Sequence, residues 1–142
     1  MRRTIGSGST WEDVVGYSRA VRVGDTVHVA GTTAVRDGRV IGAGDAYTQA
    51  RVALEIICEA LARCGASAAD VVRTRIYVTD IGLWEAVGRA HCEVFADVRL
   101  AASMVQVAAL IDPELVVEIE AEAVVGAADV PSSEDGSPLT GP

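Results

Sequence analysis

Apolar and polar residues alternate strictly near the end of the chain, over residues 115–125, which read LVVEIEAEAVV. Because successive side chains of a strand point to opposite faces, this pattern predicts a strand with one apolar and one acidic face. The apolar face carries Val117, Ile119, Ala121, Ala123 and Val125, and the acidic face carries Glu118, Glu120 and Glu122. Neighbouring carboxylates lie roughly 6.5–7 Å apart on such a face and repel one another. We therefore expect this face to have partners.

Other alternating segments predict further strands. Residues 17–23 and 26–30 are separated by Gly24-Asp25, a two-residue connection typical of a β-hairpin. Residues 39–41 form at most a short strand after a glycine-rich stretch. Residues 71–79 place Val72, Thr74, Ile76 and Val78 on one face and Arg73, Arg75 and Tyr77 on the other. Residues 103–110 alternate as well, and the turn at 112–114 makes them the expected hairpin partner of residues 115–125.

Two segments have helical periodicity instead. Asp45 is a candidate N-cap, and the apolar stripe of Ala50, Ala53, Leu54, Ile57 and Leu61 predicts a helix from residue 46 to about residue 64. Gly65 suits the left-handed conformation that ends a helix. A second helix is expected over residues 83–96, with Leu83, Trp84, Val87, His91, Val94 and Phe95 on its core side.

The order of these elements predicts one α+β domain over residues 15–126, with both helices on one face of a sheet. Residues 1–14 are expected to form a flexible arm, and residues 127–142 a disordered acidic tail. The second face of the sheet is then bare. It is either solvated, with ion pairs between its glutamates and arginines, or buried against other subunits.

Composition narrows the possible functions. The chain has 142 residues, of which 50% are hydrophobic, which fits one domain with a real core. Its net charge is −8 and no cluster of basic residues occurs, so we expect neither nucleic acid nor an anionic membrane as a partner. No apolar run approaches the roughly 20 residues of a membrane span. Three cysteines without a C-x-x-C pair and no N-terminal apolar segment predict a cytoplasmic protein with reduced thiols.

Several segments, taken in order, resemble the RidA/YjgF family of enamine/imine deaminases. GYSRAV at 16–21, followed by VHVAGT at 27–32, resembles the family's opening G-P-Y-S-x-A-V and S-G-Q segments. Gln49 with Leu54 and Gly65 is similar to its first helix, and residues 70–80 to its D-v-v-k…y-l-x-D strand. Residues 103–107 and 117–121 are similar to its closing strands. The resemblance spans residues 15–125.

This resemblance implies a chorismate-mutase-like fold that assembles into a barrel-forming homotrimer with clefts between adjacent subunits. It also implies a substrate-binding pocket in each cleft, with Glu118 orienting the attacking water. The residues that would bind a small-molecule substrate there are Tyr17, Ala30, Gly31, Thr32, Ala102, Ser103 and Met104. No cofactor is implied, and His28 and His91 have no third ligand at metal spacing, so no metal is expected.

One departure from the family pattern concerns the substrate. The family reads P-A-R-S where this chain reads LAAS over residues 100–103, so Ala102 stands in place of the arginine that clamps the substrate carboxylate. Arg99 lies three residues away, which reverses its face on a strand. The site could therefore belong to a hydrolase of C–N bonds with an altered substrate preference, to a trimer that binds a metabolite without turnover, or to a purely structural trimer. His91 is expected to be a buried, hydrogen-bonded histidine rather than a catalyst.

Overall fold

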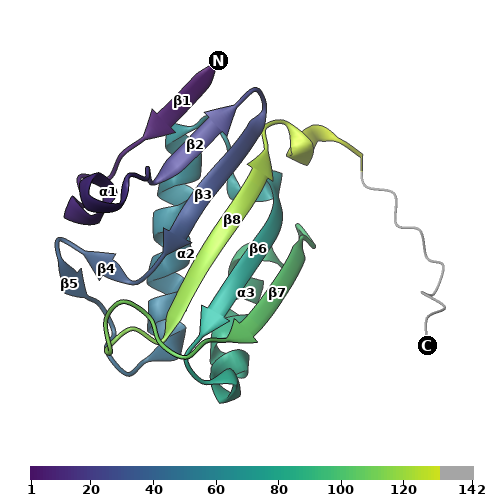
Figure 1. Ribbon diagram of the computed structural model, residues 1–142. Coiled ribbons are helices and arrows are strands. Elements are labelled where there is room, and N and C mark those ends of the chain that lie inside the picture. Colours follow the sequence, from purple (N-terminus) through teal and green to yellow (C-terminus); the bar gives the residue numbers. More distant parts are fainter. Residues whose placement is uncertain (132–142) are drawn as a thin grey trace.

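A six-stranded sheet with two helices packed on one face makes up most of the computed structural model, which describes residues 1–131 (Figure 1). The strands of this sheet are β1 (Arg2–Ile5), β2 (Ala20–Val23), β3 (Thr26–Thr32), β6 (Val71–Val78), β7 (Ala101–Gln106) and β8 (Val117–Val124). A separate small hairpin contains β4 (Val35–Arg36) and β5 (Arg39–Val40). The helices are α1 (Thr10–Val15), α2 (Ala46–Arg63) and α3 (Trp84–Phe95), with single 3₁₀ turns at Ala68–Asp70, Ile81–Leu83 and Ala127–Asp129. The predicted α+β class is confirmed.

The strand order is β1-β2-β3-β8-β6-β7, and this order corrects one prediction. β7 does not form a hairpin with β8. It pairs in parallel with β6, and β8 lies antiparallel between β3 and β6. Parallel neighbours need a crossover connection, and α3 supplies it. β7 also ends at Gln106, so a long loop, rather than a tight turn at residues 112–114, leads into β8.

The core lies between the sheet and the two helices, as the periodicities predict. On α2, the stripe Ala50, Ala53, Leu54, Ile57 and Leu61 is fully buried. Asp45 accepts a hydrogen bond from the backbone N–H of Thr48 at 3.1 Å, and Gly65 has a φ of 79°, so both helix boundaries are confirmed. The Gly24-Asp25 hairpin is confirmed too, with Val23 paired to Thr26 across the turn. Among the described residues, no helix is both long and apolar enough to cross a membrane.

Both ends of the chain differ from the prediction. β1 pairs antiparallel with β2, and α1 follows with Ser9 as its N-cap, so residues 1–14 are not a loose arm. The segment after β8 begins with an ordered turn, because the backbone N–H of Ala128 donates to the Asp70 carboxylate at 3.1 Å. Most of the predicted disordered tail, residues 132–142, lies outside the described residues.

Two side chains lie on the opposite side from the one expected. Val72 is 42% exposed and Val71 is buried, because the pairing register shifts between Val71 and Arg73. Such an irregularity moves a side chain to the other face of a strand. Trp84 starts α3 and is 56% exposed rather than packed against the core. Beyond Val72 the alternation of β6 is as predicted, and its Arg73, Arg75 and Tyr77 share the bare face with the glutamates of β8.

Candidate functional site

Two of the three glutamates on the bare face have partners from neighbouring strands. The Tyr77 hydroxyl donates to Glu120 Oε1 at 2.7 Å. Arg75 Nη1 donates to Glu122 Oε1 at 3.1 Å and lies 3.7 Å from Glu120 Oε1. His28 Nδ1 lies 3.9 Å from Glu122 Oε1. Cross-strand pairs of this kind neutralise the repulsion between like charges, which confirms the expectation that the acidic face has partners.

Glu118 is different, since its carboxylate has neither a hydrogen bond nor an ion pair among residues 1–131. The side chain is half-buried. Burial raises the pKa of Glu118, the nearby Glu120 carboxylate raises it further, and the Arg19 guanidinium opposes both effects. A carboxylate with a raised pKa is a stronger base once it is ionised. Of the three glutamates, Glu118 is therefore the one suited to accepting a proton.

The position of Glu118 depends on a bulge in β3. Val29 pairs with Ala121 and Thr32 with Ile119, so Ala30 and Gly31 together oppose a single residue of β8. At this bulge the Glu118 carboxylate packs against the backbone: a Cβ built on Gly31 would lie 2.6 Å from Glu118 Oε2. Only glycine leaves room for that approach.

Arg19 completes this group of residues, and sequence reasoning missed it. Its Nη2 donates to the Gly31 carbonyl at 2.6 Å, so Arg19 and Glu118 contact the same glycine. Burial lowers the pKa of Arg19, while Tyr17, Glu12 and Glu118 act in the opposite direction. A signal was present in the sequence. The two-residue turn at 24–25 sets a register in which Arg19 lies opposite Ala30, on the face away from the buried Ala20.

The other predicted residues of this region differ in how exposed they are and in whether they belong to the bulge. Tyr17 lies in the loop before β2 and is 37% exposed, and Ala30 is part of the bulge. Thr32 is fully buried, and its hydroxyl donates to the Ala30 carbonyl at 2.8 Å. Within one chain its side chain therefore shapes the bulge, and its part in binding a substrate stays a prediction.

Ala102, Ser103 and Met104 lie apart from this group, on the edge strand β7. The register pairs Ser103 with Arg75 on the bare face, whereas Ala102 and Met104 pair with Thr74 and Ile76 on the helix-covered side. β6 separates β7 from β8, which is a distance of about 10 Å at ordinary strand spacing. Within one chain, these three residues do not join Glu118 in a single pocket.

His91 and the cysteines have ordinary structural surroundings. His91 Nε2 lies 2.8 Å from the Thr74 hydroxyl, its ring packs on Phe95, and burial lowers its pKa. His91 is half-buried rather than buried, its hydrogen bond to Thr74 agrees with a structural role, and the expectation that it is not a catalyst stays a prediction. Cys64 is buried in the core, and burial raises the pKa of the Cys58 thiol. Within residues 1–131, no three metal-ligating side chains gather around one point.

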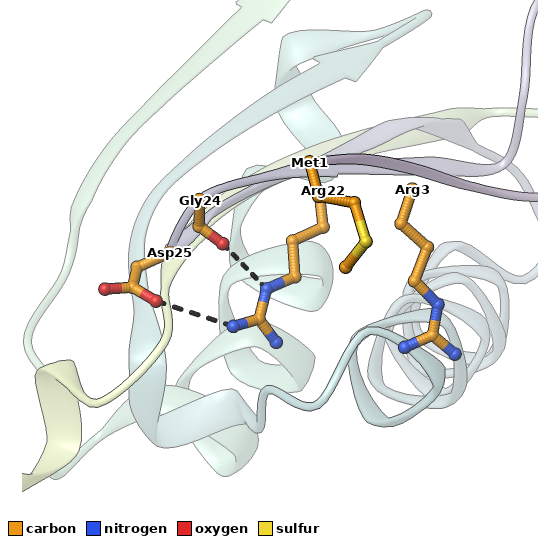
Figure 2. A pocket seen from close by; sticks show the side chains of 5 residues that line it. All are labelled: Met1, Arg3, Arg22, Gly24 and Asp25. Carbon is orange, nitrogen blue, oxygen red and sulfur yellow. Dashed lines mark hydrogen bonds and ion pairs between the residues drawn. The ribbon is translucent and has the colours of Figure 1, made fainter.

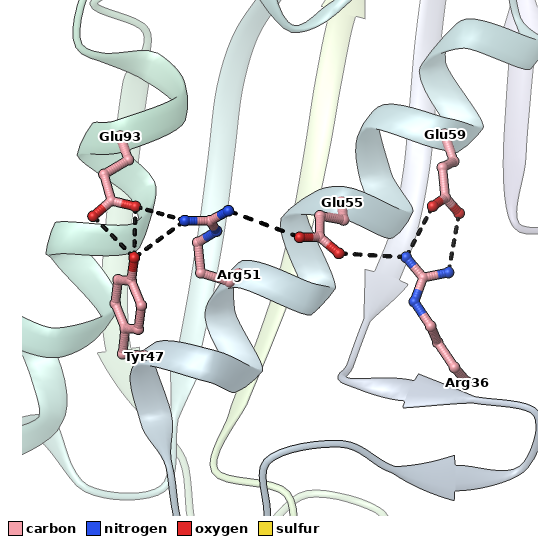
Figure 3. A network of polar contacts seen from close by, with 6 residues as sticks. All are labelled: Arg36, Tyr47, Arg51, Glu55, Glu59 and Glu93. Carbon is pink, nitrogen blue, oxygen red and sulfur yellow. Dashed lines mark hydrogen bonds and ion pairs between the residues drawn. The ribbon is translucent and has the colours of Figure 1, made fainter.

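Two surface depressions lie away from Glu118. Figure 2 shows the first, at the edge of the sheet, where Arg22 is held by the Gly24 carbonyl and by the Asp25 carboxylate. The second lies between α2 and α3, beside the chain of polar contacts in Figure 3. In that chain, Arg51 links Tyr47 and Glu93, and Arg36 contacts Glu59 at 2.8 Å. The charges of this chain of contacts are paired with one another and exposed, and neither depression lies beside Glu118.

Comparisons with known proteins identify relatives of this chain. The family model for Endoribonuclease L-PSP matches residues 8–125. An uncharacterised protein of Streptomyces coelicolor is 42% identical over 127 residues, which cover 89% of this chain and 95% of the relative. The 3-aminoacrylate deaminase RutC of Acinetobacter baylyi is 32% identical over 110 residues, which cover 77% of this chain and 86% of that enzyme.

Among solved structures, a member of the YjgF/YER057c/UK114 family from Mycobacterium tuberculosis superposes with a TM-score of 0.81. It is 53% identical, and the match covers 88% of this chain and all of that one. The fold and the order of its elements are therefore those of this family of structures.

The raised pKa of Glu118 predicts how its replacement changes stability with pH. A carboxyl whose pKa is higher in the folded than in the unfolded state costs stability when ionised, and this cost develops as pH rises through the two pKa values. We therefore expect Glu118→Gln to raise the free energy of unfolding at pH 7 and to change it less at pH 4. Urea titrations at both pH values measure the difference.

Glu122→Gln is the matched control for this experiment. It removes the same charge from the same face but breaks the contact with Arg75, so it is expected to give no gain at pH 7. Equal effects of the two substitutions at both pH values would contradict the environment assigned to Glu118.

Proposed function

Because the chain belongs to the Endoribonuclease L-PSP family, which contains the YjgF and RutC proteins, we propose that it hydrolyses the C=N bond of small imines and enamines. The observation that carries this proposal is the isolation of Glu118. It is the one glutamate of the acidic face without a partner in the described chain, and burial raises its pKa. Deaminase activity in RutC supports the reaction class.

The reaction needs one group that moves protons. An enamine first tautomerises to the imine, whose protonated form is attacked by water at carbon. The new C–O bond forms while the C=N π electrons move to nitrogen, and the proton released by water goes to Glu118. Protonated Glu118 then passes that proton to the nitrogen of the carbinolamine. When the C–N bond breaks, ammonia leaves and the hydroxyl proton goes to Glu118 as the C=O bond forms. Glu118 then releases this proton to solvent, which balances the proton that the imine took up from solvent at the start and leaves the carboxylate ionised for the next turnover. The net reaction converts imine and water into a carbonyl compound and ammonia.

The substrate pocket of this proposal lies between subunits. Glu118, Gly31 and Tyr17 lie at one side of the sheet, and Ser103 with Ala102 and Met104 lies on the edge strand, so a second copy is needed to bring the two groups together. A homotrimer whose three sheets pack together as a closed barrel would have three such clefts. Exposed apolar residues near that edge, Val105, Ile81 and Ile111, support association. Sedimentation equilibrium tests this assembly, and a monomeric mass would contradict it.

Two other functions fit less well. Cleavage of RNA is suggested by the family's description, but RNA backbones are bound by clustered basic residues, and the bare face of the sheet carries three glutamates. A trimer that binds a metabolite without turnover uses the same cleft, and ligand-dependent melting shifts without product distinguish it from an enzyme. A cytoplasmic location, with Cys58, Cys64 and Cys92 as free thiols, stays a prediction.

Replacing the proposed base tests the function directly. Glu118→Gln keeps the size of the side chain but removes the proton acceptor, so ammonia release from a panel of enamines and imines is expected to fall by about 10²–10⁴-fold. Ammonia is measured in a coupled glutamate dehydrogenase assay. Glu122→Gln, on the same face, is expected to retain activity. A Glu118→Gln enzyme as active as the wild type would exclude Glu118 as the base.

The bulge gives a second, independent test. Gly31→Ala adds a Cβ 2.6 Å from Glu118 Oε2, which pushes the carboxylate away from the bulge. The displaced atom is the end of a flexible side chain, so the melting temperature is expected to change little while kcat/KM falls at least tenfold. Unchanged kcat/KM in a folded Gly31→Ala protein would show that the contact between Glu118 and Gly31 does not position the base.

A further inference from the structure

Among residues 1–131, Arg19 is the one cation that donates a hydrogen bond to the Gly31 bulge, and most of its N–H donors are unused. A guanidinium has five N–H donors. Within residues 1–131, only the bond from Nη2 to the Gly31 carbonyl uses one of them. The Nε atom is buried and has no hydrogen-bond partner. Buried donors without acceptors are rare, because each costs free energy that water or a ligand would otherwise offset.

Four other arginines of this chain are engaged by carboxylates. Arg22, Arg36, Arg51 and Arg75 each have an Asp or Glu oxygen within 4.0 Å. Glu12 and Glu118 are close enough to raise the pKa of Arg19, but neither forms an ion pair with it in the described chain. The Arg19 side chain is also partly buried. It therefore resembles a receptor for a carboxylate that the chain itself does not supply.

We propose that Arg19 binds the carboxylate of the substrate and thereby takes over the task for which Ala102 has no donor. This assignment rests on the proposed function, because it places an acidic substrate with its anion at Arg19 and its C=N carbon toward Glu118. Both residues contact Gly31, so they are close enough to be bridged by one small molecule. The substrate class is then a small 2-imino acid or its enamine, held by the residue that precedes β2 rather than by a residue of the edge strand β7.

A second arginine, on the bare face of the sheet, is less suitable for binding the substrate carboxylate. Arg73 also has a buried Nε without a hydrogen bond. However, Glu118 pairs in register with Tyr77, and Arg73 lies four residues further along β6, about 13 Å from that point. A small acid bound by Arg73 cannot reach Glu118.

Binding at Arg19 also changes the basicity of Glu118. The charged and titratable groups around Glu118 are Arg19 before β2, Glu120 on β8 and Tyr77 on β6. Arg19 is the one group that lowers the pKa of Glu118. When a carboxylate neutralises Arg19, this effect weakens, and the pKa of Glu118 rises. An acidic substrate therefore strengthens the base that attacks it, whereas a neutral substrate does not.

The test uses pyruvate, the expected type of product, which binds without being consumed. Isothermal titration calorimetry is carried out with wild type, Arg19→Gln, Arg19→Lys and the matched control Arg2→Gln, which removes an exposed arginine from β1. Arg19→Gln is expected to weaken pyruvate binding by about ten- to a hundredfold, and Arg19→Lys is expected to weaken it less. Pyruvamide, which has no charge, is expected to bind all four proteins equally. Circular dichroism melts establish that each variant is folded.

A spectroscopic readout separates anion binding from a structural role. Saturating pyruvate is expected to raise the pKa of Glu118 in wild type, measured by carboxyl ¹³C NMR, and to leave it unchanged in Arg19→Gln. Equal pyruvate affinity in folded Arg19→Gln and wild type would overturn the proposal, as would an equal loss of pyruvate and pyruvamide binding.

These outcomes are independent of those for the proposed function. Arg19-dependent pyruvate binding without ammonia release from any substrate would refute the hydrolase and leave the carboxylate site in place. Glu118-dependent deamination whose KM for acidic substrates is unaffected by Arg19→Gln would refute the carboxylate site alone.

Discussion

The contact between the Glu118 carboxylate and the backbone of Gly31 is the constraint on which the site depends. It exists because β3 carries an extra residue opposite β8 and because that residue has no side chain. On β8 itself, Glu118 continues the row of Glu120 and Glu122, since all three pair in register with residues of β6. What differs is its neighbour on β3, because the bulge gives Glu118 a half-buried place beside Gly31, whose carbonyl accepts a hydrogen bond from Arg19. Sheet pairing thus provides the rigid frame, and the bulge in β3 positions the candidate base within it.

The three glutamates of the acidic face have two different electrostatic environments. Glu120 and Glu122 have partners, Tyr77 by a hydrogen bond and Arg75 by its charge, so they contribute to sheet stability and to the field around the site. Glu118 receives the disadvantage of burial and the repulsion of Glu120 without a hydrogen bond in compensation. Functional sites commonly contain an ionisable group whose pKa is shifted at a cost to the stability of the fold. Its stability cost and its value as a base have the same physical origin.

Local patterns in the sequence predicted the elements well, because alternation and helical periodicity report which side of each element is buried. The α2 stripe, the Asp45 cap, the hairpin at 24–25 and the two faces of β8 were all predictable in this way. Pairing between distant strands was not. The parallel partnership of β6 and β7 depends on the crossover through α3, and the turn-like residues at 112–114 favoured a hairpin that does not form. The ordered β1 was missed because four residues carry little periodicity.

The site was predictable in part for the same reason. Glu118 and Gly31 follow from the resemblance to a known family, whereas the buried position of Thr32 follows from a bulge that the sequence does not reveal. Arg19 does not follow from the resemblance, because the family carries its arginine on the strand that corresponds to β7. A register count from the 24–25 turn places it beside the site.

The most direct test of the central claim is a carboxyl ¹³C NMR titration of Glu118 in the wild-type protein, assigned by the loss of its signal in Glu118→Gln. We predict a midpoint above the value of about 4.3 for an unperturbed glutamate. A midpoint at or below that value would contradict the claim, because it would mean that Glu118 is solvated or paired and is not the unpartnered base of this site.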